Sequence, residues 1–435
     1  MKKQILKKFG NKLKKFFTQE TLNALGKATN LSKRKREITA YRLAVALITI
    51  MADHKIDSIA DIHRGFNKMF GININYKPFH NQLVKDEFPI FMRNVLEGLI
   101  NDFAMQALSF NEESPFAQFK KILLQDGSSF AVKDALSNEF PGRFKKTNPA
   151  AVELHVTLEL LTETVQSITL TPDTTSEPQF LPEVSDYSDE RTLVMGDRGY
   201  LKKSYIRKAV ECENVSCIIK GKSNMNPMVN KVILENGDEV KAWKGKELNE
   251  LKSKLRKNSV MDMDIQWNDN KKLFNCRLIV SWNPETKCYQ YLVTDLPREE
   301  FTAQEIIEAY HLRWQIELMF KEWKSFANLR KFNTEKSSIM EGLIWCSICA
   351  ATLKRYFAQL TQKMTGVSIS THKVAKSGCY FISDVMNGLI KNSATMMKEI
   401  QNAVNFIMNN AQRDSLKKDR KTGRSKLGLE ANCLI

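Results

Sequence analysis

Apolar residues recur at helical spacing in the first quarter of the chain. They do so within 43–51 and again within 91–100, inside a longer stretch, 16–110, that we predict to be helical. Between these two segments, Ser58 is placed to start one short helix, and residues 79–83 suit another. Two short helices around a turn are typical of a helix-turn-helix unit, although many small helical bundles share this pattern.

From about residue 115 the pattern changes to short apolar runs that are typical of strands. One such run leads into Asp126, and a second ends at Asp197, each beside a glycine. Residues 152–160 and 164–171 alternate between apolar and polar positions, with a short turn between them. Strands followed by an alternation of strands and helices indicate a mixed α/β domain.

Further along the chain, Asn236-Gly237 between two apolar runs predicts a tight hairpin within a mostly β segment. After Pro297 the spacing becomes helical again, over 305–326, 339–365 and 385–411. The resulting division is a helical region, a mixed domain with a β-rich insertion inside it, and a second helical region: 1–114, 115–335 with the insertion at 205–291, and 336–435.

Charge changes this picture, because the 435 residues carry a formal net charge of +17. A chain this basic favours a polyanionic partner, nucleic acid above an anionic membrane surface. Twelve of the first 40 residues are Lys or Arg, centred on a run that is expected to contact phosphates: Lys33, Arg34, Lys35 and Arg36. A second basic segment, 413–426, is either another such arm or a solvated tail.

Cysteines and apolar runs exclude several classes of protein. The eight cysteines form neither a disulfide framework nor a paired zinc pattern, and Cys346 and Cys349 are best explained by core packing. The longest apolar run is far shorter than the roughly 20 residues that span a bilayer, and no signal peptide is visible. We therefore expect a soluble, cytoplasmic protein without a membrane partner.

Three acidic positions and one helix are the candidate chemistry. Asp126 and Asp197 end strands beside glycines, where catalytic groups are often found, although each could simply start a turn. The helix after Pro297 carries a narrow polar stripe: Tyr310, Arg313, Glu317 and Lys324. A second polar stripe on it comprises Glu308, His311, Gln315 and Glu322. One stripe could face water, so the other must face something polar, unless the helix is merely exposed and stabilised by pairs within one turn.

These residues together resemble a known family. Tyr310-x2-Arg313-x3-Glu317-x6-Lys324 is similar to the Tyr-Arg-Glu-Lys signature of bacterial insertion-sequence transposases of the DDE class. Asp126 in Gln-Asp-Gly-Ser and Asp197 in Gly-Asp-Arg-Gly-Tyr are similar to the first two catalytic aspartates of that group. The order and the fixed gaps make the resemblance specific over about 115–335.

The resemblance implies an α/β fold: a ribonuclease-H-like catalytic core with a β-rich insertion, flanked by helical N- and C-terminal regions. Asp126, Asp197 and Glu317 would hold two Mg²⁺ ions, with Mn²⁺ as a substitute, since such ions prefer hard oxygen ligands. Tyr310, Arg313 and Lys324 would bind phosphates of double-stranded DNA at the element ends.

The resemblance further implies a cut-and-paste route through a DNA hairpin, carried out at the nucleoid by a homodimer whose contacts could lie in 336–435. In relatives, a Trp just before the strand that leads into the Glu helix receives a flipped base. Here that neighbourhood offers Tyr289 and Tyr291, for which strand packing is the stronger interpretation. Two other functions stay open, a metal-dependent nuclease on the same fold and a non-catalytic DNA-binding regulator.

Overall fold

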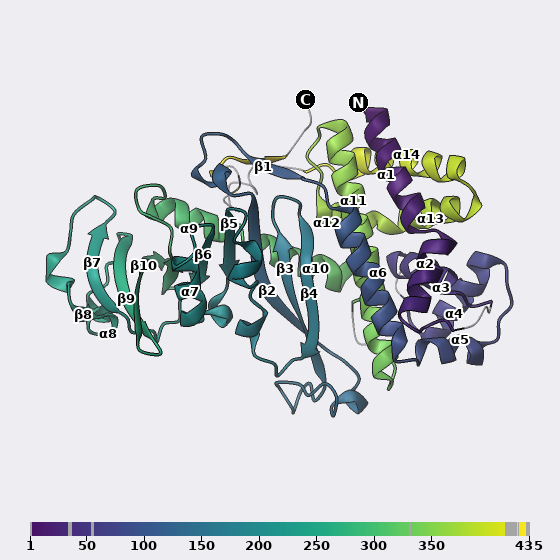
Figure 1. Cartoon of the computed structure of the whole chain (residues 1–435), viewed down its shortest axis with the longest axis horizontal. Coiled ribbons are helices and arrows are strands. Elements are labelled where there is room, and N and C mark those ends of the chain that lie inside the picture. Colours follow the sequence, from purple (N-terminus) through teal and green to yellow (C-terminus); the bar gives the residue numbers. More distant parts are fainter. Residues whose placement is uncertain are drawn as a thin grey trace.

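The computed structural model describes the chain over 2–33, 37–53, 56–329, 332–413, 424 and 426–431. Within these residues the fold is mixed α/β, with one large sheet and helices at both ends of the chain (Figure 1). Lys33 is described and exposed. The other predicted basic contacts, Arg34, Lys35 and Arg36, and most of the C-terminal basic segment lie outside the described residues.

The N-terminal region is helical, as its apolar spacing predicts. The helices are α1 (Lys2–Phe16), α2 (Gln19–Ala28), α3 (Ala40–Ala52), α4 (Ile59–Phe70), α5 (Tyr76–Leu83) and α6 (Glu87–Phe103). Ser58 starts α4 with a capping box, since its side chain accepts from the Asp61 amide while the Asp61 carboxylate accepts from the Ser58 amide. Gly71 ends α4 at φ +60°, a left-handed conformation that glycine adopts without strain. The two predicted short helices are therefore present as α4 and α5.

The central sheet has ten strands in the order β4-β3-β2-β5-β6-β11-β10-β9-β7-β8. Its first half consists of β2 (Lys121–Ala131), β3 (Ala151–Glu159), β4 (Thr164–Pro172), β5 (Thr192–Gly196) and β6 (Val215–Lys220). β2, β5 and β6 are parallel, whereas β3 and β4 are antiparallel to their neighbours. Alternate side chains of β2 enter two different cores, Leu123 on one face and Leu124 on the other. The sheet is therefore covered on both faces.

The rest of the sheet comes from the β-rich segment, β7 (Met228–Leu234), β8 (Lys246–Glu247), β9 (Met261–Asp269), β10 (Lys272–Asn283) and β11 (Cys288–Thr294). It extends the central sheet, because β11 pairs antiparallel with β6. The short helix α8 (Leu248–Leu251) lies beside β8, and Gly237 turns the predicted hairpin at φ +87°. Within the predicted range 205–291, part of α7 (Lys203–Val210) and all of β6 belong beside the parallel strands of the centre.

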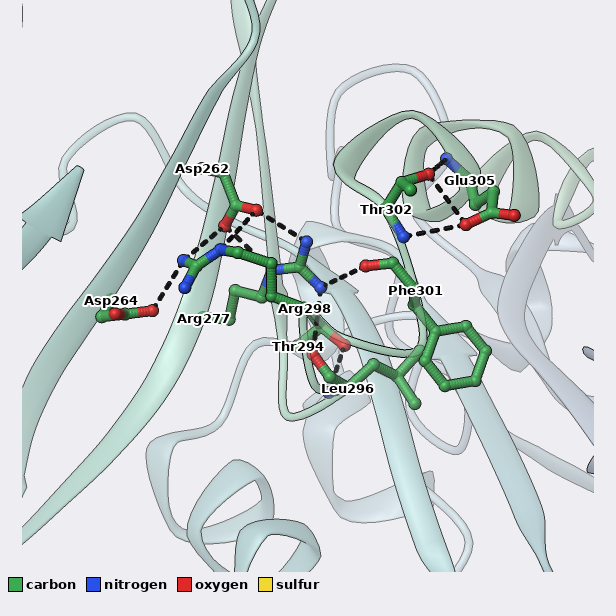
Figure 2. A network of polar contacts seen from close by, with 9 residues as sticks. All are labelled: Asp262, Asp264, Arg277, Thr294, Leu296, Arg298, Phe301, Thr302 and Glu305. Carbon is green, nitrogen blue, oxygen red and sulfur yellow. Dashed lines mark hydrogen bonds and ion pairs between the residues drawn. The ribbon is translucent and has the colours of Figure 1, made fainter. Parts of the chain in front are cut away.

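A buried polar network joins this β extension to the helix that follows it (Figure 2). Arg277 of β10 and Arg298 both donate to the Asp262 carboxylate of β9, and Arg298 also reaches Asp264 at 2.8 Å. Arg277 donates further to the carbonyls of Leu296 and Phe301, just before the Thr302 cap of the next helix. These bonds hold the segment between β11 and α9 against β9 and β10.

The chain is helical again after the β extension: α9 (Ala303–His311), α10 (Trp314–Phe326), α11 (Ser337–Thr365), α12 (Thr371–Ser377), α13 (Ile382–Lys391) and α14 (Ser393–Asn410). Two predicted single helices are each divided. The first breaks at Leu312 and Arg313, whose amides donate to carbonyls only three residues back. The second breaks at Asn392, whose side chain caps α14 by accepting from the Thr395 amide.

The long helix α11 packs against both helical regions, because it contacts α3 and α6 as well as α12 and α14. In Figure 1 it stands between the sheet and the N-terminal helices. Cys346 and Cys349 are buried in it, in agreement with the predicted packing role. No helix in the described part of the chain is long and apolar enough to cross a membrane. Near the end of the chain, β12 (Leu429–Ala431) pairs with β1 (Leu108–Phe110) in a separate small sheet.

Candidate active site

Asp126 and Asp197 are brought together by the parallel pairing of β2 and β5. Gln125 of β2 lies opposite Gly196 of β5 in the register. Asp126 and Asp197 each follow one residue later, so they lie side by side on adjacent segments. The Gly127 amide donates to Asp126 Oδ1 at 3.0 Å, and the Gly199 amide donates to Asp197 Oδ1 at 2.7 Å. Because those donors are backbone groups, both carboxylates are oriented by the sheet and the turn that follow from the local sequence.

Arg313 connects the first aspartate to the candidate glutamate. Its guanidinium donates to Asp126 Oδ2 at 2.9 Å and also to Glu317 Oε1, one turn further along the chain. Glu317 lies in the first turn of α10, and α10 packs on β2. The three carboxylates therefore converge from two strands and one helix.

The electrostatics of Asp126 reflect these neighbours. The pKa of Asp126 is raised to about 6, chiefly by burial; Arg313 lowers it, while the charges of Asp197 and Glu317 act in the same direction as burial. The Arg313 pKa lies above its usual range: burial opposes this shift, but Tyr310 and the three carboxylates outweigh it. Arg313 is therefore a permanent positive charge among three acidic side chains.

The other two members of the signature lie near this centre. Tyr310 is buried, and its ring centroid lies 5.7 Å from the Arg313 guanidinium carbon. Lys324 donates to the Ser129 carbonyl of β2 at 2.8 Å. The sequence did not single out Lys220, whose pKa is lowered by burial and by Arg313, while Asp197 and Glu317 oppose the shift. Its place at the end of the parallel strand β6 was the available signal.

The second polar stripe does not face water, which corrects the simplest expectation from the sequence. Glu322 is buried and accepts from Arg355 of α11 and from Thr371. Gln315 and Glu308 are also buried and accept from Arg424 and Lys426, near the C-terminal strand. Only His311 of this stripe is exposed. Helical spacing in the sequence could not show that residues far along the chain would pair with the second polar stripe on α9 and α10.

Comparisons with known proteins agree with this geometry. The family described as "Transposase DDE domain" matches residues 117–353. The chain belongs to that family. It is 21% identical over 370 residues to the transposase for insertion sequence element IS1151 of Clostridium perfringens, covering 76% of each chain. It is also 21% identical over 395 residues to the transposase for insertion sequence element IS231F of Bacillus thuringiensis subsp. israelensis, covering 82% of each.

A solved piggyBac transposase synaptic complex with hairpin DNA aligns with 89% of this chain and 81% of its own, at 10% identity and a TM-score of 0.46. The family and these relatives make the protein an insertion-sequence transposase, an enzyme that cleaves DNA and transfers strands. DNA is therefore its partner, and transposases of this family use divalent metal ions.

The carboxylates of this transposase suit such ions by their chemistry, since all three supply hard oxygen donors. As the side chains stand, no group of three or more His, Cys, Asp or Glu in the described part of the chain is arranged to hold a metal ion. The Arg313 guanidinium lies between Asp126 and Glu317 and compensates both charges. The donor set fits a divalent cation once Arg313 has turned away from at least one of them.

The two candidates for a flipped-base contact lie in packed positions. Tyr291 is buried in the core that the β extension forms, and the Tyr289 hydroxyl donates to the Leu255 carbonyl at 2.7 Å. The Tyr289 ring also packs edge-on against Trp282. Their surroundings favour the strand-packing interpretation. In contrast, Trp314 is 51% exposed and directly follows Arg313, an aromatic position that the sequence analysis did not select.

Proposed function

We propose that Asp126, Asp197 and Glu317 are the catalytic carboxylates of this transposase and hold two Mg²⁺ ions, with Mn²⁺ as a substitute. The observation that carries the proposal is their convergence around Arg313 from β2, the end of β5 and α10. The ions, when bound, would activate the attacking oxygen and stabilise the leaving one. The order β4-β3-β2-β5-β6, in which β2, β5 and β6 are parallel and β3 and β4 antiparallel, supports a ribonuclease-H-like core for this region.

Arg313 and Lys324 would bind phosphates of the element end. The buried Tyr310 ring, which lies beside the Arg313 guanidinium, would help to position that side chain. Arg313 is suited to phosphate binding because its five N–H donors match phosphate geometry as well as carboxylate geometry. Phosphate could therefore take Arg313 from the carboxylates as DNA binds. Trp314, exposed beside it, would offer its indole face to a displaced base.

The N-terminal region, 1–114, would bind the terminal repeats. Exposed Lys33 and the neighbouring Arg34, Lys35 and Arg36 would contact phosphates, while the pair α4 and α5 would approach a groove. Tyr76 and Lys77 at the start of α5 are exposed and could reach the duplex.

We infer a cut-and-paste route through a DNA hairpin. A single carboxylate site could carry out the successive nicks and strand transfers, and the exposed Trp314 beside it could stack on the base that hairpin formation displaces. Pairing two element ends calls for two copies of the chain, so the working form would be a homodimer acting at the nucleoid. The apolar residues Ile344, Trp345, Leu353 and Phe357 of region 336–435 are buried within the chain. The dimer is therefore proposed from the chemistry of two ends, not from an exposed apolar helix face.

An excision assay tests the proposal. Purified protein and Mg²⁺ are added to a plasmid that carries the gene with its native flanking DNA, beside an Asp197→Ala variant. Release of one defined fragment by the unmutated protein alone is the expected result. Binding of the flanks without release by either protein would favour the regulator. Nicks at scattered positions would favour the nuclease.

A further inference from the structure

The last described residues of the chain, 424 and 426–431, are attached to the body of the protein and are here called the C-terminal strap. Its strand β12 pairs antiparallel with β1, and the Gly428 carbonyl accepts from the Asn111 amide at 2.8 Å. Leu427 is buried in the same core as Ile316 of α10. The strap is therefore held in place by both backbone pairing and apolar packing.

The strap contacts one residue on each side of the break between α9 and α10. Lys426 donates to the Glu308 carboxylate of α9, and Arg424 donates to the Gln315 side-chain oxygen of α10 at 2.9 Å. Glu308 and Gln315 are both buried, on the second polar stripe of the two helices. Because one short segment holds both helices, it restricts the angle between them.

Arg424 also joins α10 to the sheet and to α11. It is only 3% exposed, and it donates to Glu163 Oε1 at 2.7 Å, in the turn between β3 and β4. Burial opposes ionisation of Glu163, yet its pKa is lowered, and Arg424 is the largest of the charges that lower it. Arg355 of α11 donates to the Glu163 carbonyl at 3.0 Å and to Glu322 of α10 at 2.7 Å. A buried polar layer thus supports α10 from behind.

The residue that Arg424 holds is next to the catalytic group. Gln315 lies midway in sequence between Arg313 and Glu317, which contact each other and, through Arg313, Asp126. The amides of Gln315 and Ile316 donate to carbonyls three residues back, so the first turn of α10 has the tighter, weaker bonding of a 3₁₀ turn. Local backbone bonds therefore fix this turn less firmly than a full α-helical turn, and tertiary contacts must complete its positioning.

We propose that Arg424 is a positioning residue for the cleavage reaction: through Gln315 it sets the place of Glu317, while Lys426 holds α9 at the matching angle through Glu308. The inference rests on the proposed function of the carboxylates. A displacement of about 1 Å at a reacting group can cost roughly 100-fold in rate, so contacts behind α10 can control cleavage without touching DNA. Binding of the element end depends on other side chains and should not change.

The first test uses the full chain with Arg424→Met and Glu163→Gln combined, so that no buried charge is left without its partner. Cleavage of native flanking duplexes should fall roughly tenfold or more, and the Mg²⁺ concentration for half-maximal cleavage should rise roughly tenfold. Affinity for the same duplex should stay within about twofold, because the phosphate contacts are intact. Lost stability alone reduces the amount of active protein and leaves the half-maximal Mg²⁺ concentration unchanged. An unchanged Mg²⁺ dependence would therefore overturn the positioning role.

The second test reverses one ion pair of the strap. Lys426→Glu places two carboxylates together and should lower cleavage, whereas adding Glu308→Lys restores the pair and should recover most of the activity. Lys208→Glu is the matched control, since Lys208 is exposed to a similar degree and pairs with Glu183 away from α9 and α10. Equal losses in Lys426→Glu and the control, or faster cleavage by Lys426→Glu, would overturn the inference.

Hydrogen exchange separates this inference from the carboxylate assignment. Amides within 312–318 of the DNA-free protein should exchange faster when Arg424 and Glu163 are both replaced, because the contact that holds the first turn of α10 is gone. Unchanged exchange there would overturn the inference, whatever happens to cleavage. Normal cleavage by Glu317→Gln would instead remove the carboxylate assignment, while faster exchange would still show that the strap holds this turn.

Discussion

Arg313 donates to Asp126 at 2.9 Å although 187 positions separate them in the chain, and the same guanidinium contacts Glu317. Without metal, this one side chain balances two of three converging carboxylates. A divalent cation and a DNA phosphate would each compete for one side of that contact, the cation for the carboxylates and the phosphate for the guanidinium. Metal and DNA should therefore favour each other's binding.

Replacing Arg313 with Ala should make stability depend on divalent metal. In EDTA at pH 7 the variant leaves three carboxylates uncompensated, and we expect a loss of about 1–3 kcal/mol in the free energy of unfolding. Mg²⁺ should recover most of it by binding between those carboxylates. Urea unfolding with and without Mg²⁺ measures this. Arg93→Ala, which removes an exposed pair with Glu97, is the control and should change little in either buffer. A loss that Mg²⁺ does not reduce would contradict the idea that Arg313 occupies a cation's place.

Glu317→Gln should separate cleavage from binding. The amide keeps the size of the side chain and leaves Arg313 and Lys324 in place, but it removes a charged metal ligand. We expect end binding within about threefold of the unmutated protein and cleavage reduced by at least about 100-fold. Gel shifts and plasmid cleavage on the same preparation give the two values. Unreduced cleavage by this variant would remove Glu317 from the catalytic set.

Lys324→Ala should reduce the salt dependence of DNA binding, with Lys321→Ala as its matched control. Both lysines are exposed on α10, but only Lys324 reaches β2 beside the carboxylates. Loss of one phosphate contact lowers the slope of log affinity against log salt by about 0.9. The slope is measured by fluorescence anisotropy on native flanking duplexes. Equal salt slopes for Lys324→Ala and Lys321→Ala would contradict a specific phosphate contact at Lys324.

The sequence predicted the three candidate carboxylates more readily than the shape of the helix that carries Glu317. Asp126, Asp197 and the spaced signature could be read directly, because each aspartate follows an apolar run and lies beside a glycine. The predicted strand end at Asp126 was wrong, since β2 continues through Asp126 and Gly127 to Ala131, whereas β5 does end just before Asp197. The break at Leu312 and Arg313 could not be read directly, since neither residue is a helix breaker. The break puts Tyr310 on α9 and Glu317 on α10, with Arg313 at the junction between them.

Long-range partners explain what else was missed. Glu322 and Glu308 look solvent-exposed in a helical pattern, but Arg355 and Lys426 bury them from segments that no local rule connects to this helix. The position of the two tyrosine candidates also depends on distant segments. Tyr291 lies on β11, a strand of the β extension, and its side chain is buried in the core there. Tertiary packing decides both cases.

Arg277→Met should test how strongly the network of Figure 2 fixes the β extension to α9. Asp262 is buried, and its pKa is lowered by Arg277 and Arg298 against the effect of burial. Losing Arg277 removes several charged hydrogen bonds and leaves two carbonyls without their donor, so we expect about 3 kcal/mol of destabilisation. Lys208→Met, which breaks an exposed pair with Glu183, should cost less than about 1 kcal/mol. Equal effects would mean that the network contributes no more than a surface pair.

His155 should make the protein less stable as the pH falls below about 6.5. The ring is buried against Phe180, and burial together with the charge of Arg143 lowers its pKa from 6.5 to about 4. Between these two values the unfolded chain binds a proton that the folded chain does not. Stability from this residue is therefore complete above pH 6.5 and declines by at most about 3 kcal/mol toward pH 4. His155→Gln, which can still bond to Thr171, removes the titration. The difference in unfolding free energy between the two proteins, measured in urea at several pH values, should be constant above pH 7 and shift in favour of the variant below it. A difference that is independent of pH would show that His155 titrates alike in the folded and unfolded chains.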